Sequence, residues 1–550
     1  MFKKNENYKQ QSLFDVTNQL TKKQRKMLEN SKEHIFFEQV FMQIDEGIFS
    51  GLYSNKKSRP NVAVNRLVGA LILKHSSNWT YEELFKNLTF NILTRHAIGI
   101  NNIEEDTFAE ASLFNFLNKL SDHLLMNGED LMEKVFEKLT SNQIEIFEIK
   151  TNIQRGDSFL MGSNIVDYTR LNLVLEVLLR LVRQLKEADK KQIAILVENY
   201  TTQTASNYTY KLEQEEYPKE LEKLGKIYHD IYEKFKSSYG KEEVFNVFER
   251  TYKEQFKIET EQVKVIPSKE LNSGILMSPD DEEATYRNKG KKKSKGFVGH
   301  ISETANPDNK FNLITDIAVK PNNTDDAKIL EERLPLMMEK TPDLDEYHCD
   351  GLYGNPEVDK ITADKIKLVQ ATMRGRRSGV KIRMRKEEDG RIMVNCQGGQ
   401  DVEIQERPNS YRAEFDIKKC NVCPLREKCK AKERGKKSGK NHCRVQTFTK
   451  AALQSHIRME NIKTIPKERR TIRANVEATV KECKRGIKDG KLRVRGLQKA
   501  KWYLVCTAIA INSIRVHQHL TSKVEKSVDI IVIHSVKFGD FCYRNQKIAA

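Results

Sequence analysis

The sequence predicts a mixed α/β fold with helical additions, and three patterns along the chain support this. GFVGHISETA and FNLITDIAVKP, residues 296–305 and 311–321, flank the turn NPDNK as a β-hairpin. A helical pattern follows, with Thr324 or Asp325 as its N-cap, and then the short strand EYHCD at 346–350. A further helix leads to the strand IKLVQATM, residues 366–373. Strands that alternate with helices build a mixed sheet with helices on its faces.

The N-terminal part of the chain is predicted to be helical. Residues 1–57 are expected to form a flexible segment and 58–140 a helical domain. Two capping boxes, Thr80 with Glu83 and Thr107 with Glu110, are expected to open helices in it. Short helices joined by tight turns suit a helix-turn-helix DNA-binding domain and an ordinary helical bundle equally well.

The middle of the chain divides into a core and an inserted block. Residues 143–160 alternate apolar and polar side chains, which predicts a strand with Asp157 near its end. The core is assigned to 141–163 and 274–373, and the Leu-rich block 164–273 is a helical insertion. The polar stretch 271–296 is expected to be a flexible linker, and its lysine run 289–296 a solvated loop, with a DNA-backbone contact as the alternative.

The C-terminal part is predicted to carry a second insertion. Residues 374–460 are basic and short-stranded, 461–520 hold two helices of the core, and 521–550 form a tail. Cys420, Cys423, Cys429 and Cys443 crowd into this insertion, with His442 beside the last. Four thiolates can hold a structural Zn²⁺ tetrahedrally, although uncoordinated reduced cysteines are the alternative.

The charge of the chain points to a polyanionic partner. Ninety-five Lys and Arg against 77 Asp and Glu give a formal charge of +18 over 550 residues. Such an excess favours nucleic acid over an acidic membrane surface. The most apolar run, residues 171–182, is too short to cross a bilayer, and the N-terminus lacks an apolar signal segment, so a cytoplasmic protein without a membrane partner is expected.

A basic helix predicted at 470–487 carries a carboxylate on its charged face. At about 100° per residue, Arg473, Glu477, Lys481 and Lys484 share one face. Two i,i+4 ion pairs, worth about 0.2–0.5 kcal/mol each, would explain Glu477 simply. A second interpretation is that Glu477 joins Asp157 and Asp350, which end strands, to bind two Mg²⁺ ions. Asp350 falls at the carboxyl end of its strand, where open α/β sheets place their active sites.

These residues resemble a known family, the DDE transposases of bacterial insertion sequences. Arg473-x3-Glu477-x6-Lys484 matches the spacing around the last acid in one branch, although Arg470 stands where many members have tyrosine. YHCDGLYGNPE matches the pattern around the second acid, and RGDSFLMGSNI resembles that of the first, where the family usually has Asp-Ser-Thr. RVRGLQKAKWYLVCTAIAINSIRV is similar to the closing helix, and SRPNVAVNRLVGALIL to the N-terminal DNA-binding domain. The likeness spans residues 58 to about 520.

The resemblance implies a ribonuclease-H-like core in which Asp157, Asp350 and Glu477 bind two Mg²⁺ or Mn²⁺ ions. Asp167 and Asp280 remain alternatives to Asp157. The candidate DNA-binding residues are Arg473, Lys481, Lys484 and Arg495. Such an enzyme would cut double-stranded DNA at inverted repeats, join the ends to target DNA as a homo-oligomer, and work at the bacterial nucleoid. A nuclease without strand transfer and an inactive DNA-binding descendant are the alternatives.

Overall fold

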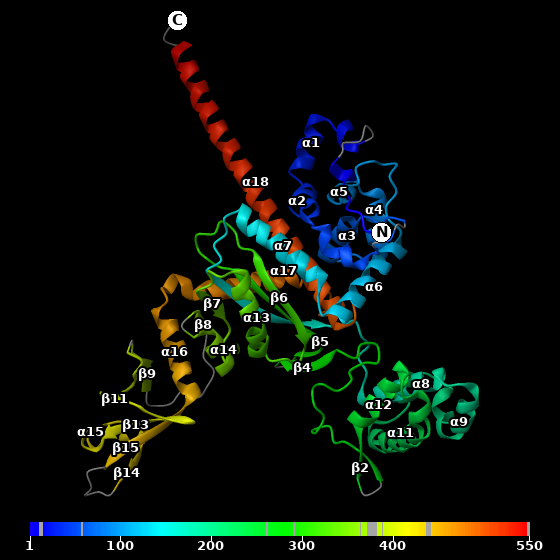
Figure 1. Ribbon diagram of the computed structural model, residues 1–550, viewed down its shortest axis with the longest axis vertical. Helices are drawn as coiled ribbons and strands as arrows, with labels where there is room; N and C mark the ends of the chain where they lie inside the picture. The colour runs from blue at the N-terminus through cyan, green and yellow to red at the C-terminus, as the bar shows by residue number, and fades with distance from the viewer. Residues whose placement is uncertain are drawn as a thin grey trace.

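The computed structural model describes the whole chain except residues 10–14, 55, 57–58, 260–261, 290–291, 364, 371–381, 388, 436–441 and 547–550. A mixed six-stranded sheet lies at its centre (Figure 1). Its strands are β1 (Ile153–Gly162), β4 (Thr285–Lys289), β5 (Lys292–Thr304), β6 (Ile314–Pro321), β7 (Glu346–Cys349) and β8 (Lys367–Gln370). Across the sheet the order is β6-β5-β1-β7-β8, with β4 paired to the first residues of β5.

Strand direction sorts the sheet into two parts. β1, β7 and β8 are parallel neighbours, whereas β5 runs antiparallel to β1, β4 and β6. The predicted hairpin is therefore confirmed as β5 and β6. The stretch 271–296 is not wholly a linker, because its second half supplies β4 and the start of β5. Part of the lysine run lies outside the described residues.

Helices cover both faces of the sheet, as the alternation along β6 shows. Ile317 and Val319 belong to the main apolar core that also contains α18 (Leu497–Gln546), whereas Ala318 packs with Ile329 of α13 (Asp326–Lys340). Successive side chains of a strand point to opposite faces, so α18 and α13 lie on opposite sides. Asp325 caps α13, as predicted, by accepting from the Ala327 amide. α14 (Pro356–Thr362) connects β7 to β8.

Helices from the N-terminal part pack onto this core rather than forming a separate body. They are α1 (Lys22–Glu29), α2 (Lys32–Gln39), α3 (Val64–Ser76), α4 (Tyr81–Phe90), α5 (Ile92–Ala97), α6 (Glu110–Asn127) and α7 (Leu131–Ile146). Thr80 and Glu83 form the expected capping box of α4. The second predicted capping box, Thr107 with Glu110, is not formed. Because α6 begins at Glu110, Ala109 occupies the N-cap position, and no side chain caps the helix there. α18 packs against α2, α3 and α7.

Two predictions for this part of the chain were wrong. Residues 1–57 contain α1 and α2, and Phe41 and Phe49 are fully buried against α3 and α6, so most of this segment is folded. The strand expected from 143 begins only at Ile153. Residues 143–146 end α7, because Leu139 and Gln143 fall on its buried face, and Glu148 then turns the chain at φ 52°.

The block 164–273, predicted as a helical insertion, has its own apolar core. It contains α8 (Arg170–Gln184), α9 (Glu187–Thr201), α10 (Ala205–Tyr210), α11 (Tyr217–Tyr239) and α12 (Glu243–Gln255), followed by the hairpin of β2 (Phe256–Glu259) and β3 (Gln262–Val265). Tyr228 and Phe248 stack at 4.2 Å between ring centroids at its centre.

The basic insertion folds into two small sheets. β9 (Ile382–Lys386), β10 (Ile392–Cys396) and β11 (Asp401–Glu403) form one; β12 (Gln405–Arg407), β13 (Ser410–Asp416), β14 (Lys432–Arg434) and β15 (Cys443–Thr449) form the other. α15 (Ile417–Asn421) follows β13, and α16 (Lys450–Thr464) leads back to β8 and α14. Residues 374–381, predicted as basic and short-stranded, lie outside the described part of the chain.

The chain returns to the sheet through η7 (Lys467–Asn475), α17 (Val476–Cys483) and α18. This segment packs by an apolar stripe next to its charged face: Ile472, Val476 and Cys483 are buried, and Val480 and Ile487 pack beside the core. The helix predicted at 470–487 is thus a 3₁₀ segment followed by a short α-helix. The predicted boundary between 520 and 521 falls inside α18.

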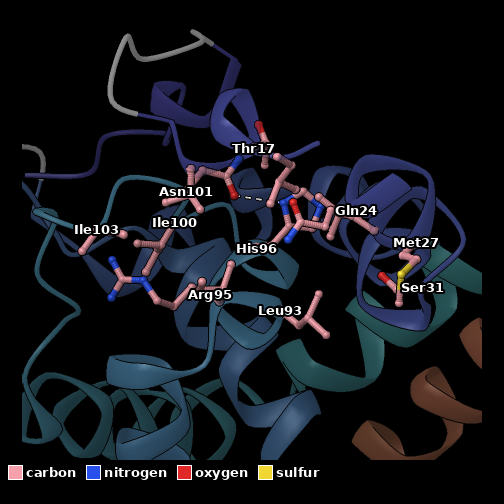
Figure 2. A pocket seen from close by; sticks show the side chains of 14 residues that line it. Thr17, Gln24, Met27, Ser31, Leu93, Arg95, His96, Ile100, Asn101 and Ile103 are labelled. Atoms are coloured by element: carbon pink, nitrogen blue, oxygen red, sulfur yellow. Dashed lines mark hydrogen bonds between the residues drawn. The ribbon is translucent and has the colours of Figure 1, made fainter. Parts of the chain in front are cut away.

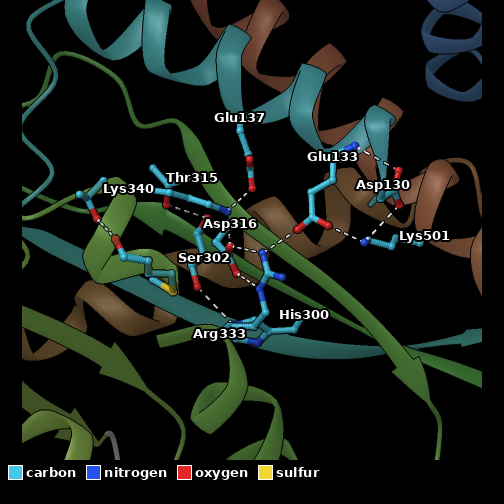
Figure 3. Close-up of polar contacts among 12 residues, drawn as sticks. Asp130, Glu133, Glu137, His300, Ser302, Thr315, Asp316, Arg333, Lys340 and Lys501 are labelled. Atoms are coloured by element: carbon cyan, nitrogen blue, oxygen red, sulfur yellow. Dashed lines mark hydrogen bonds and ion pairs between the residues drawn. The ribbon is translucent and has the colours of Figure 1, made fainter. Parts of the chain in front are cut away.

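An ionic network ties α7, β6, α13 and α18 together (Figure 3). Arg333 Nε lies 2.9 Å from Asp316 Oδ2, and its Nη2 lies 2.8 Å from Glu133 Oε1. Lys501 contacts Glu133 and Asp130. Burial alone would raise the pKa of Glu133, but Lys501 and Arg333 lower it overall. The acid therefore stays charged where the N-terminal helices meet the sheet.

Candidate active site

Asp157 lies within β1, and Asp350 directly follows the neighbouring parallel strand β7 at a matching height. Arg155 pairs with His348 in the β1–β7 register, so Asp157 and Asp350 each stand two residues further along. Adjacent strands are about 4.8 Å apart, which places the two acids side by side. The Ser158 amide donates to Asp157 Oδ1 at 2.9 Å, and the Gly351 amide to Asp350 Oδ1 at 2.6 Å.

Arg473 connects the first acid to the last. Its Nη2 lies 2.7 Å from Asp157 Oδ2 and its Nη1 3.3 Å from Glu477 Oε1. The Asp157 side chain is 16% exposed and that of Glu477 68% exposed. The expected i,i+4 pair of Arg473 with Glu477 is therefore present, and its arginine also reaches a strand 316 residues away in sequence. One guanidinium faces both carboxylates.

A buried ionic network anchors the segment that bears Arg473 and Glu477. Glu303 of β5 is fully buried between Arg155, whose Nε lies 2.7 Å from Oε1, and Arg515, whose Nη1 lies 2.8 Å from Oε2. Arg155 also donates to the Ile472 carbonyl at 3.0 Å, and the Thr479 hydroxyl donates to Glu303 at 2.7 Å. The segment is thus held on either side of Arg473 and Glu477.

A second set of contacts supports the strand that bears Asp350. Glu346 Oε1 lies 2.6 Å from His348 Nε2, and Glu346 also pairs with Arg469. Burial opposes ionisation of Glu346, but His348 and Arg469 lower its pKa overall. Cys349 is fully buried in the apolar core beside β7, and burial raises the pKa of its thiol.

Gly156 permits the close approach of β7 to β1. A Cβ at this position would stand 1.9 Å from the hydroxyl of Tyr347, a fully buried side chain of β7. That hydroxyl lies 2.8 Å from Ser302 of β5. Gly156, immediately before Asp157, therefore leaves room beside β1 for Tyr347 of β7, which contacts Ser302 of β5.

A basic groove begins next to Asp157. It has a volume of about 970 Å³ and runs from Ser158 past Phe159 to Gly490. Its lysines are Lys293, Lys295, Lys484 and Lys491. Lys484 lies 5.4 Å from the ring centroid of Phe159, within the range of a cation–π contact. Asp167 and Asp489 also line the groove, so its lysines outnumber its acids by four to two.

The other candidate residues occupy different settings. Asp167 pairs with Lys491 at 3.1 Å and Lys295 at 3.5 Å. Asp280 pairs with Arg180 at 3.1 Å and with Arg495 at 3.5 Å. Arg495 also donates to the Asn164 carbonyl at 2.6 Å, so it is engaged within the protein. Lys481 is exposed on α17.

Three of the four predicted zinc ligands share one cavity. Cys420, Cys423 and Cys429 line it together with Cys396, whereas Cys443 does not line it. His442 lies 2.6 Å from Glu433. Within the described residues, no group of three or more His, Cys, Asp or Glu side chains is arranged to hold a metal ion.

Sequence patterns did not reveal Arg155, Glu303 and Arg515, which hold the site from behind. An acid inside a predicted strand, such as Glu303 in GHISETA, is the signal that could have drawn attention to them. Their pairing depends on segments far apart in the sequence.

A separate apolar cavity lies in the N-terminal helices, away from the acids (Figure 2). It measures about 410 Å³ and is bounded by side chains such as Met27, Leu93 and Ile103. His96 closes one side, with its Nδ1 2.9 Å from Asn101 Oδ1. None of the candidate site residues lines this cavity.

Asp157 lies midway along β1, not at its end as predicted, and Asp350 directly follows β7. These two acids beside a lysine-lined groove define a site suited to phosphoryl transfer on a polyanion. Two family models match the chain: Transposase domain (DUF772) over residues 22–119 and Transposase DDE domain over residues 396–517. The chain is thus a DDE transposase of the insertion-sequence type, a metal-dependent DNA phosphoryl-transfer enzyme.

The two matches cover different parts of the molecule. The first corresponds to α1–α6, and the second runs from the end of β10 into α18 and includes Glu477. Asp157 and Asp350 fall outside both. No curated protein and no solved structure matches the chain. Among the described residues, no helix combines the length and apolar character that a bilayer span requires.

Proposed function

We propose that this transposase cuts DNA at the ends of its insertion sequence and joins the freed 3′ ends to target DNA, with Asp157, Asp350 and Glu477 as its catalytic acids. The observation that carries the proposal is the Arg473 guanidinium, which contacts both Asp157 and Glu477. The β1–β7 register adds Asp350 at the height of Asp157. Asp167 and Asp280 are favoured less, because they pair with Lys491 and Arg180 and not with the arginine that contacts Glu477.

The sheet supports a ribonuclease-H-like core. Its order β6-β5-β1-β7-β8, with β5 alone antiparallel among these five strands, is the arrangement that this fold class has. The first acid then lies in the central strand and the second follows the neighbouring strand. Residues 164–273 and 374–460 are insertions into that core.

The donor set suits Mg²⁺ or Mn²⁺. Hard divalent cations prefer carboxylate oxygens, and Asp157 and Glu477 already face a common cation in Arg473. Such ions would activate the attacking oxygen and neutralise charge at the phosphorus. A family branch with the Arg-x3-Glu-x6-Lys spacing is proposed on the same residues.

The chain's own cations would place the DNA. Arg473 stands between two acids, where it can both hold their orientation and meet a phosphate. Lys484 and the other lysines of the groove would bind the backbone, with Lys481 on the exposed side of α17. Arg495 would have to leave Asp280 to contribute. Pairing of two DNA ends at the bacterial nucleoid by a homo-oligomer is part of the proposal.

The test is cleavage of a plasmid bearing the element's ends by the purified full-length protein with Mn²⁺. Asp157→Asn, Asp350→Asn and Glu477→Gln should each reduce cleavage about 100-fold or more, because each removes charge stabilisation from the reacting centre. Asp167→Asn and Asp280→Asn are matched controls that should retain cleavage. Full cleavage by Glu477→Gln would refute its assignment as a catalytic acid. Loss of cleavage in Asp167→Asn with full cleavage by Asp157→Asn would assign the role of the first acid to Asp167.

The products separate the alternatives. Joined DNA ends establish strand transfer, whereas cleavage without joined products would indicate a nuclease. Specific binding of the ends without cleavage by the unaltered protein would indicate an inactive descendant.

A further inference from the structure

Four cysteines from three segments of the basic insertion face one small cavity. Cys396 ends β10, Cys420 lies in α15, Cys423 follows α15, and Cys429 follows a short 3₁₀ turn. All four line a small cavity of about 30 Å³. All are free thiols.

The backbone turns these cysteines toward the same point. The Cys423 amide donates to the Cys420 carbonyl at 3.3 Å, which forms a tight turn across the CxxC pair. On the other side, the Gly399 amide donates to the Cys396 carbonyl at 2.9 Å. A Cβ built on Gly398 would lie 3.0 Å from Cys423 Sγ and 3.6 Å from Cys396 Sγ. The sulfurs of two distant segments therefore share the space that this glycine leaves open.

Cys443 stands outside this arrangement. It begins β15, where it pairs with Asp416 of β13 and Arg434 of β14. The cavity is lined instead by Arg444, the next residue, whose Nε donates to the Ala431 carbonyl at 2.9 Å. Since neighbouring side chains of a strand point to opposite faces, Cys443 is directed away from the cavity.

The charges around the cavity suit four thiolates with a dication. Zn²⁺ bound by four deprotonated cysteines has a net charge of about −2. Arg426 and Arg444 both line the cavity and would offset that charge. Apolar side chains such as Phe415 and Leu425 complete the lining and would keep water from the ligands.

We propose that Cys396, Cys420, Cys423 and Cys429 form a structural zinc site, with Cys396 rather than Cys443 as the fourth ligand. Each thiol would give up its proton to solvent as its sulfur binds the ion. The ion would draw the sulfurs inward from their present positions, which do not form a metal-binding group. Cys396 belongs to the β9–β11 sheet, and the other three ligands follow β13 of the second sheet, so the ion would cross-link the two sheets.

The zinc content of the full-length protein tests the proposal. After expression with zinc and removal of loose metal, the unaltered protein should carry one zinc per chain by mass spectrometry of the metal. Cys396→Ser should lower the content at least tenfold, whereas Cys443→Ser, the matched control, should keep it. Full zinc content in Cys396→Ser together with its loss in Cys443→Ser would overturn the assignment, as would the absence of zinc from the unaltered protein.

Thiol protection in the unaltered protein keeps the test independent of folding defects. Zinc should protect Cys396, Cys420, Cys423 and Cys429 from alkylation, as read by peptide mass mapping, and leave Cys443 reactive. Protection of Cys443 and alkylation of Cys396 would contradict the site. Neither readout uses DNA cleavage, so the result is separate from that of the proposed function.

Discussion

The central sheet and the small sheets of the basic insertion belong to one strongly basic chain, but they hold their polar groups differently. Behind the acids, Glu303 and its two arginines come from three segments up to 360 residues apart and are buried in a large apolar core. In the described part of the insertion, the buried apolar side chains form a small cluster around Met384, Val394 and Phe415. Small cores need a covalent or metal staple, and large ones can stabilise buried charges. The difference predicts which region depends on a metal and which on ion pairs.

Metal removal should have the largest effect, and only in the insertion. Structural zinc contributes about 10–16 kcal/mol in zinc-finger peptides, and that binding energy is folding energy. If the proposed site is present, a zinc chelator should make residues 382–449 sensitive to trypsin at least tenfold faster, while β1, β5 and β6 stay protected. The measurement is limited proteolysis with peptide mapping, in buffer with Mg²⁺.

Cys396→Ser supplies the control, because it should be cleaved in the insertion without any chelator. Equal sensitivity of the insertion with and without zinc would remove the distinction between the two regions. A chelator that also exposed the central sheet would show that the insertion and the core fold as one unit.

Removing Glu303 should have the next largest effect. Glu303→Gln would remove the buried carboxylate that Arg155 and Arg515 share and leave Arg515 with only the more exposed Glu482, which costs about 3–5 kcal/mol of the free energy of unfolding. Urea denaturation followed by circular dichroism measures this. DNA cleavage should also fall under conditions where the variant is folded, because the Ile472 and Thr479 contacts position the segment that bears Glu477.

Glu482→Gln is the matched control for Glu303→Gln. Glu482 also pairs with Arg515, at 3.0 Å, but its side chain is 38% exposed. Exposed pairs contribute about 0–1 kcal/mol, so this variant should unfold close to the unaltered protein. Equal loss in both variants would show that Arg515, rather than the burial of Glu303, decides the stability.

The elements predicted correctly from the sequence are those that local sequence patterns determine. Asp325 as the cap of α13, the hairpin of β5 and β6, and the strand that ends before Asp350 all follow from short-range patterns. The i,i+4 relation of Arg473 to Glu477 follows from helical periodicity. Each of these needs only a few neighbouring residues to form.

What the sequence could not predict depends on contacts between distant segments. The alternation of Ile144 and Ile146 resembled a strand, yet those residues end α7, since helix packing overrode the local pattern. Cys396 was passed over because it stands 24 residues before the CxxC pair, and only the pairing of β10 with its neighbours brings it near. Glu303 likewise acquires its partners only when β1 and α18 pack around it.

Lowering the pH should have the smallest effect on stability, and this effect should also differ between the central sheet and the basic insertion. Glu346 is buried in the sheet, and its contacts with His348 and Arg469 lower its pKa despite that burial. Asp389 is exposed in the insertion, and the Arg391 amide and guanidinium lower its pKa. Unfolded Glu has a pKa of 4.5, so the unfolded state binds the extra proton first as pH falls. Stability from Glu346 is thus present above pH 4.5 and lost as pH falls through the lower folded value.

Urea midpoints measured from pH 6 to about pH 3 should therefore fall less steeply in Glu346→Gln than in the unaltered protein. Asp389→Asn should leave the profile unchanged, because solvent screens its exposed pair. A steeper dependence on Asp389 than on Glu346 would mean that surface pairs, and not buried ones, set the acid stability of this protein.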